Sequence, residues 1–359
     1  MNPSAYARTF TNRTSQHGLS LIELMIAITI GLLILSALVT LFVNQSKTRT
    51  ELDKSNRLID NGRYALEVLS ENLRLAGFYG ERDLTSLAVI SDPCTTNLAE
   101  MRDALGLHVA GYDASGVGTA IVSPPCGLTA ADLKNGSDIL VLRRADTTSI
   151  PAVSAITGTH YIQISSCQPG TTAINDSPFV IGTAATNFSL HQRDCTSVAN
   201  VRRFFVQTYY VSPNHIAGDG IPTLKVIELD PAGTGAFIIT PLVEGIEYLQ
   251  VEYGIDGDNN ADDVMDDING DGVVNEKDKD GAADNYVTNC TTAVCWSNVV
   301  SVRLNVIARN TETTAGYTNT NTYTLGQAGT FGPFSDSYKR HVYTQVVRLV
   351  NPSSRRESP

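Results

Sequence analysis

A long apolar stretch with a single charge constrains this chain more than any other feature. Residues 19–43 are predominantly apolar and carry one ionisable side chain, Glu23. At ~1.5 Å per residue, a helix of this length is ~37 Å long, which exceeds the ~30 Å hydrocarbon core of a bilayer. A carboxylate inside such a helix costs ~2.5–3.5 kcal/mol on insertion scales and usually marks a function. We therefore expect a membrane-spanning helix in which Glu23 has a role of its own.

The residues before this stretch form a polar leader. Residues 1–18 include Arg8 and Arg13, contain no apolar run and end at Gly18. A conventional secretory signal is cleaved after its apolar region, next to small residues, and Ser36-Ala37 offers only a weak site of that kind. Here the small residue, Gly18, precedes the apolar run. We interpret residues 1–18 as a leader peptide that is not part of the fold.

Helical character continues beyond the membrane segment. Residues 44–76 contain no proline, and Gly77 follows them as a plausible C-cap. One apolar stripe recurs at helical spacing, through Leu52, Ile59, Leu66, Leu69, Leu73 and Ala76. This predicts a single helix over residues 19–76. Its first half is apolar on all sides, as in lipid or a helix bundle, and its second half packs one side on a domain.

The rest of the chain is β-rich. Short apolar runs separated by Gly, Pro, Ser and Asn predict strands at residues 139–143, 161–164, 202–211, 223–229, 236–240, 248–254, 299–308 and 342–350. No long helical patterns separate the later strands, which favours antiparallel pairing. The predicted fold class is α+β: a long N-terminal helix packed on a mostly antiparallel head over residues 77–350. Residues 351–359 are expected to be a frayed tail.

Net charge excludes one large class of partners. The chain carries 37 acidic and 26 basic residues, for a formal net charge of −11. Binding to nucleic acid requires a basic face, so no nucleic-acid partner is expected. The acidic residues are concentrated between Glu252 and Asp284. This local excess indicates a metal site more than a generally solvated surface.

The cysteines indicate disulfide bonds formed outside the cytoplasm. There are six of them, an even number in a chain with an export signal. Six cysteines allow about 15 pairings, and the sequence does not select one. Pairing of sequence neighbours is the simplest arrangement: Cys94 with Cys126, Cys167 with Cys195, and Cys290 with Cys295. The spacing of the cysteines and the scattered histidines argue against zinc.

The acidic segment contains a pattern typical of calcium loops. Residues 267–278 fit D-x-N-x-D-G-x-x-N-x-x-D, which resembles the loops of dockerins and EF-hands, with Gly272 at the sharp turn. The expected Ca²⁺ ligands are Asp267, Asn269, Asp271, the Val273 carbonyl, Asn275 and Asp278. A second, poorer set is Asp256, Asp258, Asn260 and Asp262. The alternative is an acidic loop that binds no ion.

The start of the apolar stretch carries a family resemblance. The sequence Gly18-Leu19-Ser20-Leu21-Ile22-Glu23 resembles the processing site of type IV prepilins. The resemblance implies that the membrane-embedded prepilin peptidase cuts after Gly18 and methylates the new amine of Leu19. Glu23 is then the fifth residue. A carboxylate in an apolar helix needs a positive partner, and the Leu19 amine of a neighbouring subunit could supply it.

Three further stretches resemble the PilW family of minor pilins, namely residues 61–80, 241–254 and 342–351. This resemblance implies a type IV pilin-like fold and a subunit of the bacterial inner membrane, with its head in the periplasm, that ends at the pilus tip at the cell surface. It implies a role in priming and capping the pilus, and hence in adhesion and twitching motility. The implied partners are other minor pilins, the major pilin, the assembly platform, the prepilin peptidase and a PilY-type tip adhesin.

Two other functions remain open at the level of sequence. The two later stretches, residues 241–254 and 342–351, also resemble GspJ-like minor pseudopilins, so a type II secretion system is the alternative machine. An enzyme anchored in the membrane and acting in the periplasm is the alternative from another class. The sequence contains no G-x-S-x-G, P-loop or H-E-x-x-H motif, so no catalytic residues are expected.

Overall fold

The computed structural model describes residues 18, 20–80, 84, 89–167, 178–256 and 281–356. The chain divides into two compact units, Met1–Asp53 and Lys54–Pro359. The second unit is the head. Its first residues come from the second half of the long helix, so the head begins some twenty residues before Gly77, the start expected from sequence.

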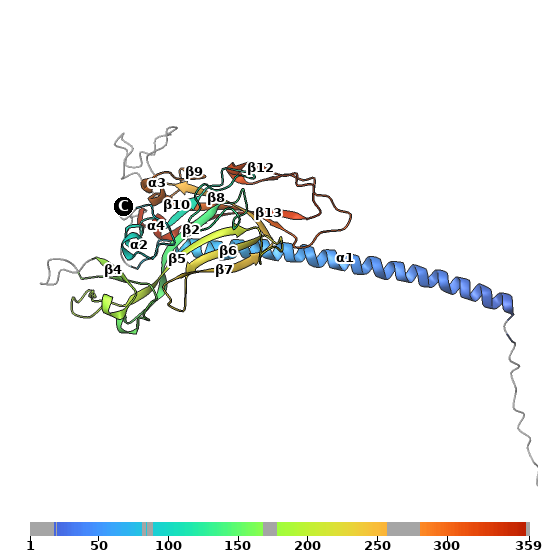
Figure 1. Ribbon diagram of the computed structural model, residues 1–359, viewed down its shortest axis with the longest axis horizontal. Helices are drawn as coiled ribbons and strands as arrows, with labels where there is room; N and C mark the ends of the chain where they lie inside the picture. The colour runs from blue at the N-terminus through green and yellow to red at the C-terminus, as the bar shows by residue number, and fades with distance from the viewer. Residues whose placement is uncertain are drawn as a thin grey trace, which may run out of the picture. The chain divides into compact units, whose positions relative to one another are not determined.

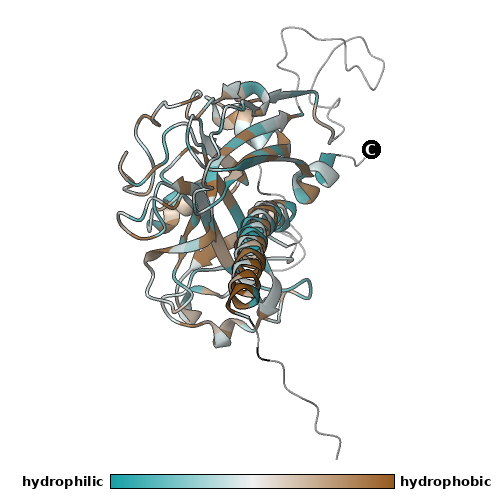
Figure 2. Cartoon of the chain, turned by 90° about the vertical axis from the view of Figure 1, so that its right-hand side faces the viewer, coloured by the Kyte–Doolittle hydropathy of each residue, from teal (hydrophilic) through white to brown (hydrophobic). Residues whose placement is uncertain are grey.

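Helix α1 (Leu21–Leu75) confirms the predicted long helix. Hydropathy changes along it, and Figure 2 shows its N-terminal part in the colours of apolar residues and its later part with polar ones. In the head, its buried residues are Leu58, Gly62, Ala65, Leu66, Leu69, Ser70 and Leu73. The predicted stripe is confirmed from Leu66 onward. It is wrong at Leu52, which is exposed, and at Ile59, because the neighbouring Leu58 is the buried residue.

The largest sheet has seven strands. They are β1 (Val109–Tyr112), β2 (Ile139–Ile150), β3 (Tyr161–Ile164), β4 (Phe179–Gly182), β5 (Val201–Ser212), β6 (Thr223–Leu229) and β7 (Phe237–Glu244). Strands β1, β2, β5, β3 and β4 follow one another across the sheet, and β6 joins β5 to β7. Figure 1 shows β5, β6 and β7 side by side in the head. Strand β5 is 12 residues long, so one of its edges can pair with β3 near its start and with β6 near its end.

A second sheet has four strands, in the order β13, β10, β8, β9. Their bounds are β8 (Ile246–Ile255), β9 (Asn285–Val287), β10 (Val299–Arg309) and β13 (Arg340–Arg348). Strands β11 (Tyr323–Thr324) and β12 (Thr330–Phe331) form a separate pair. All pairings among the described strands are antiparallel, which confirms the expectation. Each of the eight predicted strands is present.

The main hydrophobic core joins α1 to both sheets. Leu69 and Leu73 of α1 are fully buried, together with residues of the large sheet such as Leu142 and of the smaller sheet such as Val306. The opposite face of the large sheet is buried in a second core, which includes Val141. Because successive side chains of a strand point to opposite faces, the run Ile139-Leu-Val-Leu142 supplies both cores.

Three short helices escaped the sequence analysis, and one of them corrects it. They are α2 (Leu98–Asp103), α3 (Ala293–Ser297) and α4 (Val350–Arg356). Helix α4 occupies most of the expected frayed tail, so that prediction is wrong for residues 351–356. Ser353 is fully buried, and its hydroxyl donates to the Val300 carbonyl at 3.1 Å. The sequence of α4 is polar and contains no apolar stripe, so hydrophobic periodicity does not predict this helix. Hydrogen bonds such as that of Ser353 hold it in place.

Helix α4 also holds the end of α1. Asn351 Nδ2 donates to the Ala76 carbonyl at 3.1 Å, and an Arg355 guanidinium nitrogen donates to the Gly77 carbonyl at 3.1 Å. Gly77 has a φ of 72°, in the left-handed region that ends helices, as expected of a C-cap glycine. The C-terminal residues thus satisfy carbonyl groups that a helix end leaves without partners.

We predict that Gly62→Ala destabilises the head although alanine is the better helix former. A Cβ at Gly62 would lie 2.1 Å from a ring carbon of Tyr343 on β13. Overpacking of this kind costs ~1–3 kcal/mol, which exceeds the gain in helix propensity of ~1 kcal/mol. Urea unfolding of the full-length chain in detergent, followed by tyrosine and tryptophan fluorescence, measures the effect.

Gly31→Ala is the matched control on the same helix. No atom lies within 4 Å of a Cβ at Gly31, so this variant should unfold at the wild-type urea concentration or slightly above it. Equal midpoints for the two variants would contradict a close approach of α1 to Tyr343.

Candidate functional site

The start of α1 has the features that a processing site requires. Gly18 is exposed, and no atom lies within 4 Å of the position that a Cβ would take. Its identity is therefore not explained by packing within this chain. Leu19, the expected new N-terminus, lies outside the described residues.

Glu23 and Ser20 form a reciprocal capping box. The Ser20 backbone N–H donates to Oε2 of Glu23 at 2.9 Å, and the Glu23 backbone N–H donates to the Ser20 hydroxyl at 3.3 Å. Such a pair satisfies two donors that the first turn of a helix leaves without partners. The carboxylate also lies at the positive end of the helix dipole. Glu23 is thus engaged within its own chain, a partner that the sequence analysis did not foresee.

Helix α1 has the length and composition to cross a membrane. An 18-residue window reaches a mean hydropathy of 2.7, and none of its residues is buried. Two hydroxyl groups in this part donate to carbonyls of the same helix: Thr29 to Ile26 at 2.8 Å and Thr40 to Ser36 at 2.9 Å. These polar side chains can therefore lie in an apolar environment without losing a hydrogen bond.

Most of the predicted calcium ligands lie outside the described residues. This holds for Asp267, Asn269, Asp271, Val273, Asn275 and Asp278, and for Asp258, Asn260 and Asp262 of the second set. Asp256 is described and is buried, with 2% of its surface exposed. Its Oδ2 accepts a hydrogen bond from the Gly281 backbone N–H at 2.9 Å. The two ends of the acidic segment are therefore joined.

Arg356 of α4 completes this junction. Its Nη1 lies 3.1 Å from Oδ2 of Asp256 and donates to the Asp256 carbonyl at 2.7 Å. Its Nη2 donates to the Ser297 carbonyl at 2.8 Å and to Oδ1 of Asn298 at 2.9 Å. Asp256 thus has a cationic partner, which weakens its candidacy as a metal ligand.

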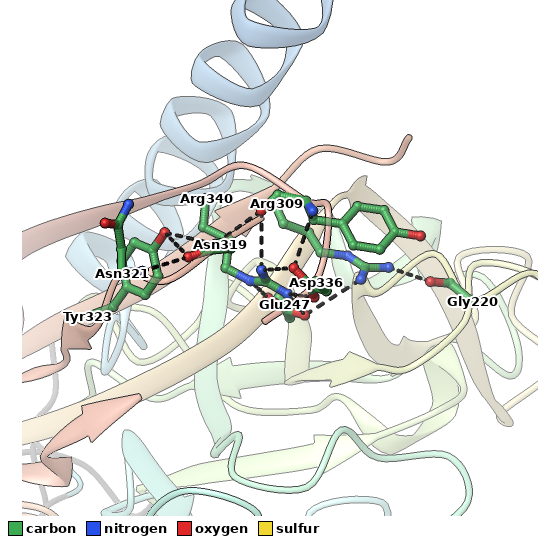
Figure 3. Close-up of polar contacts among 9 residues, drawn as sticks. Gly220, Glu247, Arg309, Asn319, Asn321, Tyr323, Asp336 and Arg340 are labelled. Carbon is green, nitrogen blue, oxygen red and sulfur yellow. Dashed lines mark hydrogen bonds and ion pairs between the residues drawn. The ribbon is translucent and has the colours of Figure 1, made fainter. Parts of the chain in front are cut away.

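A cluster of charges around the buried Glu247 and Arg340 lies at the start of β8 and β13 and the end of β10 (Figure 3). Arg340 bridges two carboxylates: Nη2 donates to Glu247 at 3.0 Å, and Nη1 donates to Asp336 at 2.7 Å. Nη1 of Arg309 lies 3.6 Å from Glu247. Burial alone would lower the pKa of Arg340, but Asp336 and Glu247 outweigh burial and hold it above its ordinary value. Hydrogen bonds from Arg340 in turn lower the pKa of Asp336.

This cluster fixes the long connection between β10 and β13. Asn319 is fully buried there, and its side-chain amide donates to the hydroxyl of Tyr323 and to the carbonyl of Tyr338, each at 3.0 Å (Figure 3). Asn321 donates its backbone N–H to Oδ1 of Asn319 at 3.1 Å. No local sequence pattern predicts this cluster, because Glu247 and Arg340 are 93 residues apart.

Three disulfides confirm the pairing of sequence neighbours. The bonds are Cys94–Cys126, Cys167–Cys195 and Cys290–Cys295. Where the structure describes the chain, one group of His, Cys, Asp and Glu side chains is close enough to hold a metal, namely Asp92, Cys94 and Cys126. Both of its thiols are consumed in a disulfide, so this group is not a metal site.

Two family models match the chain. The prokaryotic N-terminal methylation motif matches residues 13–39, which contain Gly18 and Glu23. The model for PilW, described as type IV pilus-assembly protein W, matches residues 208–351, from β5 to α4. No curated protein and no solved structure matches the chain significantly. The matched families are pilus components rather than enzymes. Together, the methylation motif and the PilW match support a PilW-family minor pilin of type IV pili.

Proposed function

We propose that the chain is made as a prepilin and cut after Gly18 by the prepilin peptidase, which methylates the new amine of Leu19. The methylation-motif match and the exposed, unpacked Gly18 support this. Residues 19–43 then hold the subunit in the bacterial inner membrane with its head in the periplasm. Since Ser20 and Glu23 both follow the cut, the capping box remains in the mature chain.

Glu23 is proposed to bind the N-terminal amine of a neighbouring subunit during assembly. Its Oε2 accepts from Ser20, whereas Oε1 has no donor among the residues that the structure describes. The capping box therefore orients the carboxylate and leaves one oxygen free for an incoming amine. An ion pair in an apolar helix bundle is strongly favoured over either charge alone.

The subunit is proposed to prime pilus assembly and to cap the fibre at its tip at the cell surface. One helix supplies both the apolar segment and part of the core of the head. The expected partners are other minor pilins, the major pilin, the assembly platform and a PilY-type adhesin. Adhesion and twitching motility would then depend on this chain. The PilW match favours a pilus over a secretion pseudopilus.

The acidic segment is proposed to bind Ca²⁺ through Asp267, Asn269, Asp271, Val273, Asn275 and Asp278. The loop pattern carries this proposal. The junction of Asp256, Gly281 and Arg356 supports it, because an ion bound between these anchored ends would stiffen a segment already closed at its base. The stiffened segment would offer a shaped surface to a partner.

We predict that Glu23→Gln reduces incorporation into pili at least ~10-fold. Glutamine keeps a capping oxygen but removes the charge, and loss of one partner of a buried ion pair costs ~3–5 kcal/mol. Immunoblots of sheared pili, normalised to the amount of the chain in membranes, measure incorporation. Ser20→Ala is the control, since it weakens the cap and keeps the charge. Wild-type incorporation of Glu23→Gln would rule out the amine contact.

We predict that Ca²⁺ raises the unfolding midpoint of the full-length chain and that Asp267→Ala and Asp271→Ala abolish this rise. At one hundred times the dissociation constant, a bound ion stabilises the folded state by ~2.7 kcal/mol. Thermal unfolding with Ca²⁺ and with a chelator gives the comparison. Glu276→Gln is the matched control, because it removes a charge of the same loop at a position without a ligand role. An equal rise in all variants would contradict the site.

A further inference from the structure

A pocket at the free edge of the large sheet contains a buried guanidinium. The pocket has a volume of about 370 Å³, and Arg143 of β2 lies in its wall beside Val141 and Tyr112. Strand β1 forms this edge, since it pairs with β2 alone. Trp296 of α3 also lines the pocket.

Arg143 has no ion pair within the described part of the chain, and Asp92 is the nearby carboxylate that acts on its charge without contacting it. Only 3% of its surface is exposed, and its Nη1 donates to the Leu107 carbonyl at 2.9 Å. The described part of the chain offers no ion pair to Arg143 and no acceptor to its Nε and Nη2. Burial lowers the pKa of this side chain, although the nearby Asp92 acts in the opposite direction. A buried charge without an ion pair is costly, and an anion in the pocket would reduce this cost.

The other walls restrict which anion fits. Val141, Ile121 and Trp296 are buried, apolar and lie in the lining. Asp113 lines the same pocket and accepts from the Ser115 backbone N–H at 2.7 Å, so a doubly charged anion would be repelled more strongly than a singly charged one. A single carboxylate attached to an apolar group satisfies both conditions, and a phosphate does not.

The surface around the pocket indicates how the ligand continues. Ile90 and Val122 line the pocket and are 53% and 89% exposed. A ligand longer than the pocket would cover these side chains, as a polypeptide does. Two disulfides support the walls, since Cys290 lies in the lining and Pro93 precedes Cys94. The site is therefore largely preformed, which lowers the entropy lost on binding.

We propose that this pocket binds the C-terminal residue of a partner polypeptide, with its carboxylate on Arg143 and an apolar side chain against Trp296. This site is separate from the helix contact at Glu23, and it does not depend on the proposed position at the pilus tip. The interaction would recognise the end of a chain, because an internal residue has no terminal carboxylate to offer.

The test uses the full-length chain in detergent and a fluorescent peptide, Gly-Gly-Ser-Leu-Leu, with either a free carboxylate or a terminal amide. We expect the acid to bind at least ~10-fold more tightly than the amide in fluorescence anisotropy. Arg143→Gln should make the two peptides equal. Ala120→Trp should weaken binding of the acid without unfolding the chain, because Ala120 is exposed in the lining.

Arg144→Gln is the matched control on the next residue, whose guanidinium lies over Phe205 and donates to Asn72. It should keep the preference for the acid. Equal binding of acid and amide by the wild-type chain would overturn the anion site. If N-acetyl-leucine competes with an affinity equal to that of the peptide, the ligand is a small organic acid and not the C-terminus of a polypeptide.

Discussion

The burial of one face of α1 is the interaction on which the rest of the head depends. Leu69 and Leu73 are fully buried where both sheets meet the helix, and burial of each leucine contributes about 1.5–3 kcal/mol. Removing the helix would expose the core face of both sheets. The second half of α1 is therefore an integral part of the head.

The sequence predicts the parts of this fold that periodicity encodes. Local patterns predict helix α1, strands such as β5, and the antiparallel pairing of the strands. The three disulfides match the simplest pairing of neighbours. Leu52 is exposed although it fits the helical spacing. An apolar stripe indicates which face of a helix is apolar, but it does not indicate where along the helix the head begins to cover that face. The helix α4 was mistaken for a tail because its burial depends on hydrogen bonds made by polar residues such as Ser353.

The candidate sites also differ in whether a local sequence motif reveals them. Gly18, Glu23 and the acidic loop are local motifs, and their residue types carry the chemistry. The cluster of Glu247 and Arg340 and the pocket around Arg143 depend on contacts between residues far apart in the sequence. Nothing near Arg143 in the sequence distinguishes it from Arg144, whose side chain lies over an aromatic ring. Only the alternation of faces along β2 separates the two.

We propose that this chain is a prepilin whose helix begins, after processing, at Leu19. Mass spectrometry of the N-terminal peptide, from the protein purified out of its native membranes, tests this most directly. We expect a peptide that starts at Leu19 and carries one methyl group on its amine. A peptide that starts at Met1, or one that starts after a cut near Ala37, would contradict it.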